Sequence, residues 1–230
     1  CMDQIMERDN QNPFQGSYNG YLTLAASGRE QPLATHADRY SFNSGYGISA
    51  YSKGAVFLAQ LGYIIGQDKL MASLRRYYDD FKFKHPTPND FIRSAERVSG
   101  MELEWYLTDW TQTTNTIDYA IESVESLEGD ASQTAITLKR VGLMPMPIDL
   151  LVVFKDNTQK TYYAPLKMLY GEKENPYPTI DREVLKDWPW AQEVYTVMVD
   201  APRDQILAVL IDPSQLMADI APENNGWQAE

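Results

Sequence analysis

Hydrophobic residues follow two different periods along the chain. From the N-terminus to about Trp110, apolar residues recur every three or four positions, which predicts amphipathic helices. After the polar run 111–116 the period changes to two, which predicts half-buried strands. The sequence therefore predicts an α + β chain with helical residues 1–115, a β-sandwich at 116–212, and a closing edge segment with a polar tail at 213–230.

The helical half contains four predicted helices with short connections, at about 51–65, 68–81, 88–99 and 103–110. Thr87, Pro88 and Asp90 form a helix start, with a capping hydroxyl, a proline in the first turn and an acid three residues after the cap. Gly66 can take the left-handed cap of the first helix. Such short connections predict a packed antiparallel bundle. The second helix is predicted to bury Leu70, Leu74, Tyr77, Tyr78 and Phe81.

The β half contains six clear strand candidates. They lie at 120–125, 135–140, 148–154, 160–164, 194–199 and 206–211. Asp156 and Asn157 predict a tight turn between two of them. Short strands without intervening helices are typical of an antiparallel β-sandwich. At the other end, residues 1–8 resemble the tail of an amphipathic helix without an initiator methionine, so we expect the chain to be a fragment of a longer protein.

Composition excludes several classes of partner. The net charge of −12 argues against nucleic acid and against an anionic membrane surface, because both are recognised by clustered Lys and Arg. No run of 18 apolar residues predicts a transmembrane helix. Cys1 is the only cysteine, so neither an intrachain disulfide nor a zinc finger can form. The compartment stays open between an exported and a cytoplasmic location.

Common catalytic groups do not form recognisable sets. His36 and His85 are the only histidines, no H-E-x-x-H is present, and both are expected to be surface or capping residues. A pair of carboxylates of the glycosidase type is not singled out by any spacing. Asp79 and Asp80 point to different faces, while Glu102 and Glu104 suit the first turn of a helix. Cys1 has no placed base.

Tyr51 is the candidate that stands out. It precedes an apolar helix and follows Gly45-Tyr46-Gly47, which predicts a mobile or sharply turned approach. A phenol at such a position can donate a hydrogen bond to a developing oxyanion. The alternative is a half-buried aromatic with its hydroxyl in water. Tyr46 could line a substrate pocket, with a plain loop aromatic as the alternative.

An ordered block of residues carries a family resemblance. The block consists of Ala50-Tyr51-Ser52-Lys53-Gly54-Ala55, Gly66-Gln67-Asp68, Tyr77-Tyr78, Phe81-Lys82-Phe83-Lys84-His85-Pro86-Thr87, Asp90-Phe91, Gly100, Leu103, Trp105 and Asp109-Trp110. Thr113–Tyr119, Ile211-Asp212-Pro213, Asp219 and Asn224-Asn225 extend it. Over about residues 40–225 the chain resembles the gluzincin zinc aminopeptidases (the alanyl-aminopeptidase and leukotriene-hydrolase family), downstream of their H-E-x-x-H motif.

The resemblance implies a fold for the chain, a role for Tyr51 and a location for the zinc ligands. The fold would be the helical C-terminal half of a thermolysin-like catalytic domain followed by an antiparallel β-sandwich. Tyr51 would stabilise the oxyanion during hydrolysis of an N-terminal peptide bond. The zinc ligands and the general-base glutamate would lie upstream, so zinc would belong to the full-length parent and this chain alone would bind none and be inactive. Its partners would be the peptide substrate and the upstream half of the same polypeptide.

Two further residues match the Tyr51 element, and two rival functions stay open. We expect Lys53 to be a solvated lysine at a helix start and Gly54 to permit close helix packing. One rival is a non-catalytic, peptidase-like binding or scaffold module. The other is a sandwich that binds carbohydrate or protein, suggested by aromatic residues that are more typical of a sandwich core. These are Tyr162, Tyr163, Trp188, Trp190 and Tyr195.

Overall fold

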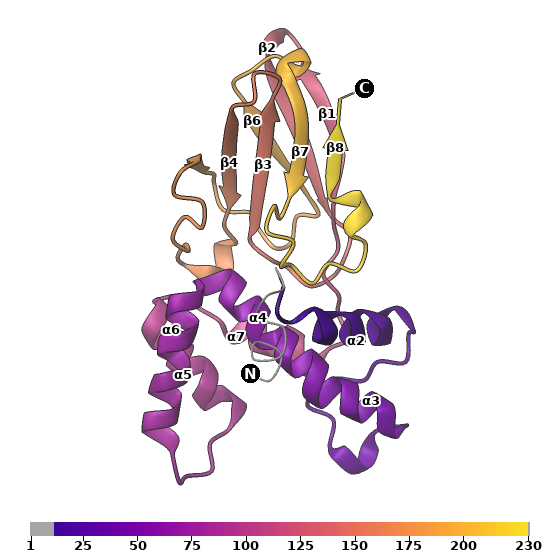
Figure 1. The fold of residues 1–230 in the computed structure, drawn as a ribbon, viewed down its shortest axis with the longest axis vertical. Coiled ribbons are helices and arrows are strands. Elements are labelled where there is room, and N and C mark those ends of the chain that lie inside the picture. The colour runs from indigo at the N-terminus through magenta and orange to yellow at the C-terminus, as the bar shows by residue number, and fades with distance from the viewer. Residues whose placement is uncertain (1–11, 230) are drawn as a thin grey trace. The chain divides into compact units, whose positions relative to one another are not determined.

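The computed structural model describes residues 12–229, and their contacts separate into two compact units. Of the described residues, 12–116 and Gly171–Glu174 form one unit, and Ile117–Tyr170 and 175–229 form the other. The first unit is helical and the second is built from strands (Figure 1). The predicted α + β class is therefore confirmed. The helix tail predicted at residues 1–8 lies outside the described residues.

Consecutive helices make up the first unit. They are α2 (Gln15–Ala26), α3 (Asn43–Gly47), a π-helical segment (Ile48–Lys53), α4 (Gly54–Ile65), α5 (Gln67–Phe81), α6 (Pro88–Ser99) and α7 (Glu104–Gln112). The last three confirm the helices predicted at 68–81, 88–99 and 103–110. Helix α2 was not predicted separately, because its buried face consists of Tyr18, Tyr21 and Leu24 with Ser17, a weak hydrophobic signal. Within residues 12–229, no helix has the length and apolarity needed to cross a membrane.

A fully buried tryptophan organises the helical core. Trp110 has no exposed surface, and its ring contacts those of Tyr21 at 5.4 Å, Tyr106 at 6.0 Å and Phe57 at 6.4 Å between centroids. The Tyr106 hydroxyl donates to the Phe57 carbonyl oxygen at 2.5 Å. Aromatic residues thus link α2, α4 and α7 both by area buried and by ring geometry.

Of the five positions predicted to be buried in α5, only Leu70 is buried; Leu74, Tyr77 and Phe81 are half-buried, and Tyr78 is exposed. Tyr78 in α5 is 65% exposed, although its spacing places it near the apolar face. The ammonium group of Lys82 lies 5.9 Å from the centre of its ring. The phenol can stay in water at little cost because its polar tip remains solvated. By contrast, Leu70 on the same helix is buried as predicted.

Two sheets form the second unit. One has the order β1 (Tyr119–Leu127), β2 (Asp130–Arg140), β6 (Val194–Val199). The other has the order β5 (Asp181–Val184), β4 (Gln159–Ala164), β3 (Ile148–Phe154), β7 (Ile206–Ile211), β8 (Gly226–Gln228). Strand β1 of the first sheet contacts β7 and β8 of the second, and the long strands run in similar directions (Figure 1). All six predicted strands are present.

The sheets differ from the prediction at their edges. Strand β5 pairs in parallel with β4, so the second sheet is mixed rather than antiparallel. Strands β5 and β8 were missed because Asp-Arg-Glu-Val and Gly-Trp-Gln are too short to show an alternating pattern. Ile117 forms an isolated bridge with Asp219, and β8 pairs with β7, so the closing segment is part of this unit. The predicted turn at Asp156 and Asn157 joins β3 to β4, with Asn157 at φ 66°.

Most of the sandwich aromatics are core residues. Tyr162, Tyr163 and Trp188 are at most 1% exposed, and Trp188 packs edge-on against Tyr119 at 5.5 Å. These three rings are therefore buried among apolar side chains and form no exposed platform for a sugar. Trp190, at 58% exposed, is an exception.

Tyr119 provides a stability test of the sandwich. Its hydroxyl, fully buried, donates to the Met146 carbonyl at 3.1 Å and accepts from the Met146 N–H at 2.8 Å. Tyr119→Phe should lower the free energy of unfolding by about 1–3 kcal/mol, because both Met146 groups lose their partner in a buried setting. Urea denaturation would measure the change. Tyr170→Phe is the control, since Tyr170 is 82% exposed and its loss of a hydroxyl should be nearly neutral.

The start of α6 provides a pH test. The Asp90 carboxylate accepts from the Thr87 N–H at 2.7 Å and from the Thr87 hydroxyl at 2.8 Å, and these bonds, the backbone one first, hold the pKa of Asp90 below its usual value. The resulting stabilisation should be present above the unfolded-state pKa of Asp and be lost as pH falls through the lowered folded-state pKa. Thermal melting of wild type and Asp90→Asn should therefore converge in acid. A difference in melting temperature that persists unchanged to low pH would contradict this.

Candidate functional site

Tyr51 lies in the middle of a long helix and not at its start. Helix α3, the π-helical segment Ile48–Lys53 and α4 follow one another without a break, and the joining residues Gly47, Ile48 and Gly54 all have right-handed helical angles. The predicted mobile or turned approach at Gly45–Gly47 is therefore wrong, because these glycines are helical. Two glycines so close together weaken the helical signal in a sequence. In Figure 1, α3 and α4 run on from one another.

The glycines of this helix differ in what they permit. A Cβ atom on Gly45 would come within 2.6–3.0 Å of the Phe42 ring, so the ring needs the space. A Cβ atom on Gly54 would meet only the Ser49 carbonyl oxygen, at 4.0 Å, so the close-packing role predicted for Gly54 is wrong for the described residues. The close approach is made by Gly20 of α2, where a Cβ atom would lie 2.8 Å from the Ser52 Oγ.

The π-helical segment presents different side chains in opposite environments. Tyr51 is 78% exposed, whereas Ser49 and Lys53 have no exposed surface. Widened π-helical turns inside α-helices occur frequently at functional sites. Here the widened turn holds the Tyr51 phenol out from the helical unit while Ser49 and Lys53 are buried. The Tyr51 phenol is thus accessible to a ligand that approaches from solvent.

Tyr46 precedes this segment and is partly exposed. Its side chain is 43% exposed, and its ring packs edge-on against Tyr40 at 5.5 Å. The Tyr40 hydroxyl in turn donates to the Pro32 carbonyl at 3.2 Å. Tyr46 therefore has a held orientation and an accessible face, which is compatible with both a pocket residue and a loop-supporting aromatic.

Lys53 is buried, contrary to the expectation of a solvated lysine. Its ammonium nitrogen lies 2.6 Å from the Glu30 carboxylate, and the two side chains are 0% and 4% exposed. The ring centroids of Trp110 and Tyr21 lie 5.7 Å and 5.9 Å from the same nitrogen. Burial, followed by the charge of Glu30, raises the pKa of Tyr21. Glu30 and Lys53 are 23 positions apart, and a single sequence contains no signal that pairs residues at such a distance. Glu30 could therefore not be predicted as the partner of Lys53.

The histidines and carboxylates of the described part of the chain do not assemble a metal site. His36 caps a short helix at Ala37–Arg39, where its Nδ1 accepts from the Asp38 N–H at 3.3 Å, and His85 is exposed. No group of three or more His, Cys, Asp or Glu side chains within residues 12–229 is arranged to hold a metal ion. The described residues therefore do not fit the role of a zinc-ligand set.

Glu96 is a perturbed carboxyl that the sequence did not single out. Burial raises its pKa, opposed by a hydrogen bond from the Leu103 N–H at 3.0 Å and reinforced by Glu102 and Glu104 nearby. Glu104 occupies the first turn of α7, as predicted. The bond to Leu103 ties the end of α6 to the start of α7, so a structural role accounts for Glu96.

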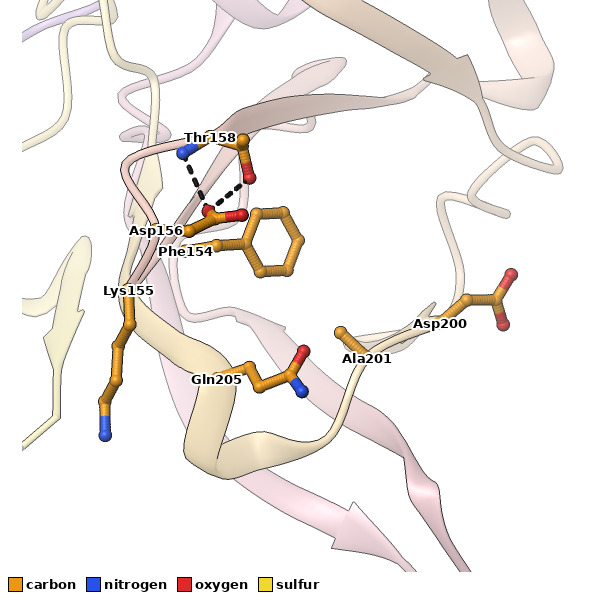
Figure 2. A pocket seen from close by; sticks show the side chains of 7 residues that line it. All are labelled: Phe154, Lys155, Asp156, Thr158, Asp200, Ala201 and Gln205. Atoms are coloured by element: carbon orange, nitrogen blue, oxygen red, sulfur yellow. Dashed lines mark hydrogen bonds between the residues drawn. The ribbon is translucent and has the colours of Figure 1, made fainter.

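Two hollows lack converging polar groups. In the helical unit, about 230 Å³ is enclosed by apolar residues and Thr111, whose hydroxyl already donates to Leu107. In the strand unit, about 470 Å³ lies between the β3–β4 turn and the segment before β7 (Figure 2). Figure 2 shows the Lys155 and Asp200 side chains pointing away from one another, and Asp156 hydrogen-bonded to Thr158. Neither hollow is lined by Tyr46 or Tyr51.

Comparisons with known proteins relate part of the chain to a peptidase family. Residues 2–110 match the model of the peptidase family M1 domain. The comparison with curated proteins found no match. Among solved structures, the crystal structure of Legionella pneumophila aminopeptidase A in complex with aspartic acid is similar, with a TM-score of 0.50 and 16% sequence identity. The match covers 76% of this chain and 18% of that chain, and at this identity it establishes the fold alone.

The matched residues include the π-helical segment, the buried ion pair and the aromatic core. The family resemblance predicted from the block Ala50–Trp110 is thus confirmed by a match that spans the block. Over residues 2–110 the chain is therefore similar to part of the peptidase family M1 domain.

Proposed function

We propose that this chain is part of a zinc-dependent aminopeptidase in which Tyr51 stabilises the oxyanion formed at the scissile carbonyl. The observation that carries the proposal is the 78% exposure of Tyr51 on a π-helical turn whose neighbours Ser49 and Lys53 are fully buried. The M1 match over residues 2–110 supports the reaction class. The zinc ligands are assigned to residues outside this chain, since the described residues supply no such set.

The chemistry assigned to Tyr51 follows from the properties of a neutral phenol. A phenolic O–H can donate one hydrogen bond to the carbonyl oxygen of the substrate. That bond strengthens as the oxygen gains negative charge, so it lowers the energy of the transition state more than that of bound substrate. Preorganisation matters here, because a donor that is already oriented needs no rearrangement when the charge develops.

Tyr46 is proposed to line the substrate pocket. Its ring is held by Tyr40 and is 43% exposed, and it lies one residue before Gly47, where the helix leads into the π-helical segment. A ring in that position can supply apolar contact to substrate. Such contact is made equally in the ground state and the transition state, so it would affect KM more than kcat.

Replacing the phenol tests the proposed role of Tyr51. In the protein that joins this chain to its zinc-binding half, Tyr51→Phe should lower kcat on the order of 10²–10³-fold with little change in KM, because one oxyanion donor is lost. Hydrolysis of an aminoacyl anilide under saturating conditions measures this. Tyr78→Phe is the matched control, since Tyr78 is also an exposed helical tyrosine of the same unit, at 65% exposure. Wild-type kcat for Tyr51→Phe would refute the proposed role.

The assignment of zinc to residues outside the chain has its own test. The 230-residue chain alone should bind no zinc in equilibrium dialysis and should not cleave an aminoacyl anilide when zinc is added. The physical reason is that His36 and His85 are a cap and an exposed loop residue, without partners arranged for a metal. Stoichiometric zinc binding with zinc-dependent cleavage by this chain would contradict the assignment.

A further inference from the structure

The π-helical segment contains a buried charge whose presence needs an explanation. Lys53 and Glu30 are 0% and 4% exposed, and their charged atoms are 2.6 Å apart. Removing two charges from water costs several kcal/mol per ion, and a well-packed apolar pair of similar volume is often at least as stable. Stability alone therefore does not explain an ion pair at this place. Fixing one geometry among several is a better-attested use of such pairs.

Both partners are held in place from several sides. The ammonium group of Lys53 lies beside the paired rings of Tyr21 and Trp110, 5.9 Å and 5.7 Å from their centroids, and 3.5 Å from the Thr113 carbonyl oxygen. Trp110 and Tyr21 are themselves fully buried. A lysine surrounded in this way has one available position, so the end of the π-helical segment is fixed relative to α2 and α7.

The loop that carries Glu30 is fixed by its flanking residues. The Arg29 guanidinium lies 4.2 Å from the centre of the Phe42 ring, just before α3. The Gln31 side chain accepts from the Ser41 N–H at 2.7 Å and donates to the Arg39 carbonyl at 3.2 Å. The carboxylate therefore belongs to a loop that is tied to the residues preceding the long helix.

Tyr51 lies two residues from Lys53 in the same turn, and Gly20 lets α2 contact Ser52 between them. Contacts of Ser52 and Lys53 thus hold the turn directly beside the exposed Tyr51 phenol. We infer that the Lys53–Glu30 ion pair is a positioning device that sets the direction of Tyr51. This inference rests on the proposed function of Tyr51. Lys53 and Glu30 are positioning residues, since neither is exposed to a substrate.

The test must separate positioning from stability. Replacing Lys53 alone would leave an uncompensated buried carboxylate, which is strongly destabilising. We therefore choose Lys53→Met together with Glu30→Leu, which leaves no buried charge. In the protein that contains the zinc-binding half, this double variant should melt near the wild-type temperature. Its kcat should nevertheless fall about tenfold or more, with KM within about twofold, because a misplaced donor loses its effect in the transition state.

Repeating the double substitution in Tyr51→Phe protein tests whether the Lys53–Glu30 ion pair acts through the Tyr51 hydroxyl. In Tyr51→Phe protein the double substitution should cause no further fall in kcat, because the hydroxyl that it would misplace is already absent. A general structural effect would lower kcat by the same factor in both backgrounds. That equal factor, or a folded double variant with kcat within about twofold of wild type, would overturn the inference alone. Unchanged kcat for Tyr51→Phe itself would overturn the proposed function, and the inference with it.

Two further variants complete the design. Glu30→Asp keeps both charges but shortens the reach of the carboxylate, so it should lower kcat severalfold without loss of fold, and wild-type kcat would again contradict positioning. Lys139→Met is the ion-pair control. Its partner Glu122 lies 3.1 Å away, but both side chains are more than 40% exposed, so kcat and melting temperature should change little.

Discussion

The π-helical turn at Ile48–Lys53 buries a charged side chain and exposes a phenol, and the packing of the helical unit permits both. Its inner side carries a lysine and a serine that are completely buried, while its outer side carries a phenol that is mostly exposed. The buried charge is tolerated because Glu30 pairs with it and because the rings of Tyr21 and Trp110 lie within 6 Å of it. Those rings belong to the core around Trp110 that links α2, α4 and α7. The turn that exposes Tyr51 is therefore held by residues of the aromatic core.

The fold was largely predictable because its elements obey simple periodicities. Helix α6 could be bounded at both ends, since Thr87, Pro88 and Asp90 mark its start and Gly100, at φ 74°, marks its end. Strands β3, β6 and β7 were placed because their apolar residues are dense and bounded by turns. The failures have local causes. Strand β5 is charged and four residues long, and it is held by parallel pairing with β4, a tertiary contact that no local pattern announces.

The candidate site was predicted in part. The importance of Tyr51 came from the family resemblance, and its exposure is what that role requires. The setting of Tyr51 was mispredicted, because Gly45 and Gly47 read as loop residues although the helix runs through them. Lys53 was mispredicted for a different reason: a lysine is buried only when a distant partner meets it, and Glu30 is 23 positions away. The close approach at Gly20 could not be predicted for the same reason, because Gly20 contacts Ser52, which is distant in the sequence.

We propose that the Tyr51 hydroxyl contacts the oxygen that becomes negative during peptide hydrolysis. The most direct measurement is a crystal structure of the protein that joins this chain to its zinc-binding half, bound to a phosphinic dipeptide analogue of the tetrahedral intermediate. We expect the Tyr51 Oη at about 2.7–3.1 Å from a phosphinyl oxygen, the distance of a formed hydrogen bond to an oxyanion. A bound analogue with the Tyr51 hydroxyl turned to solvent, out of hydrogen-bonding reach of the analogue, would rule out this role for Tyr51.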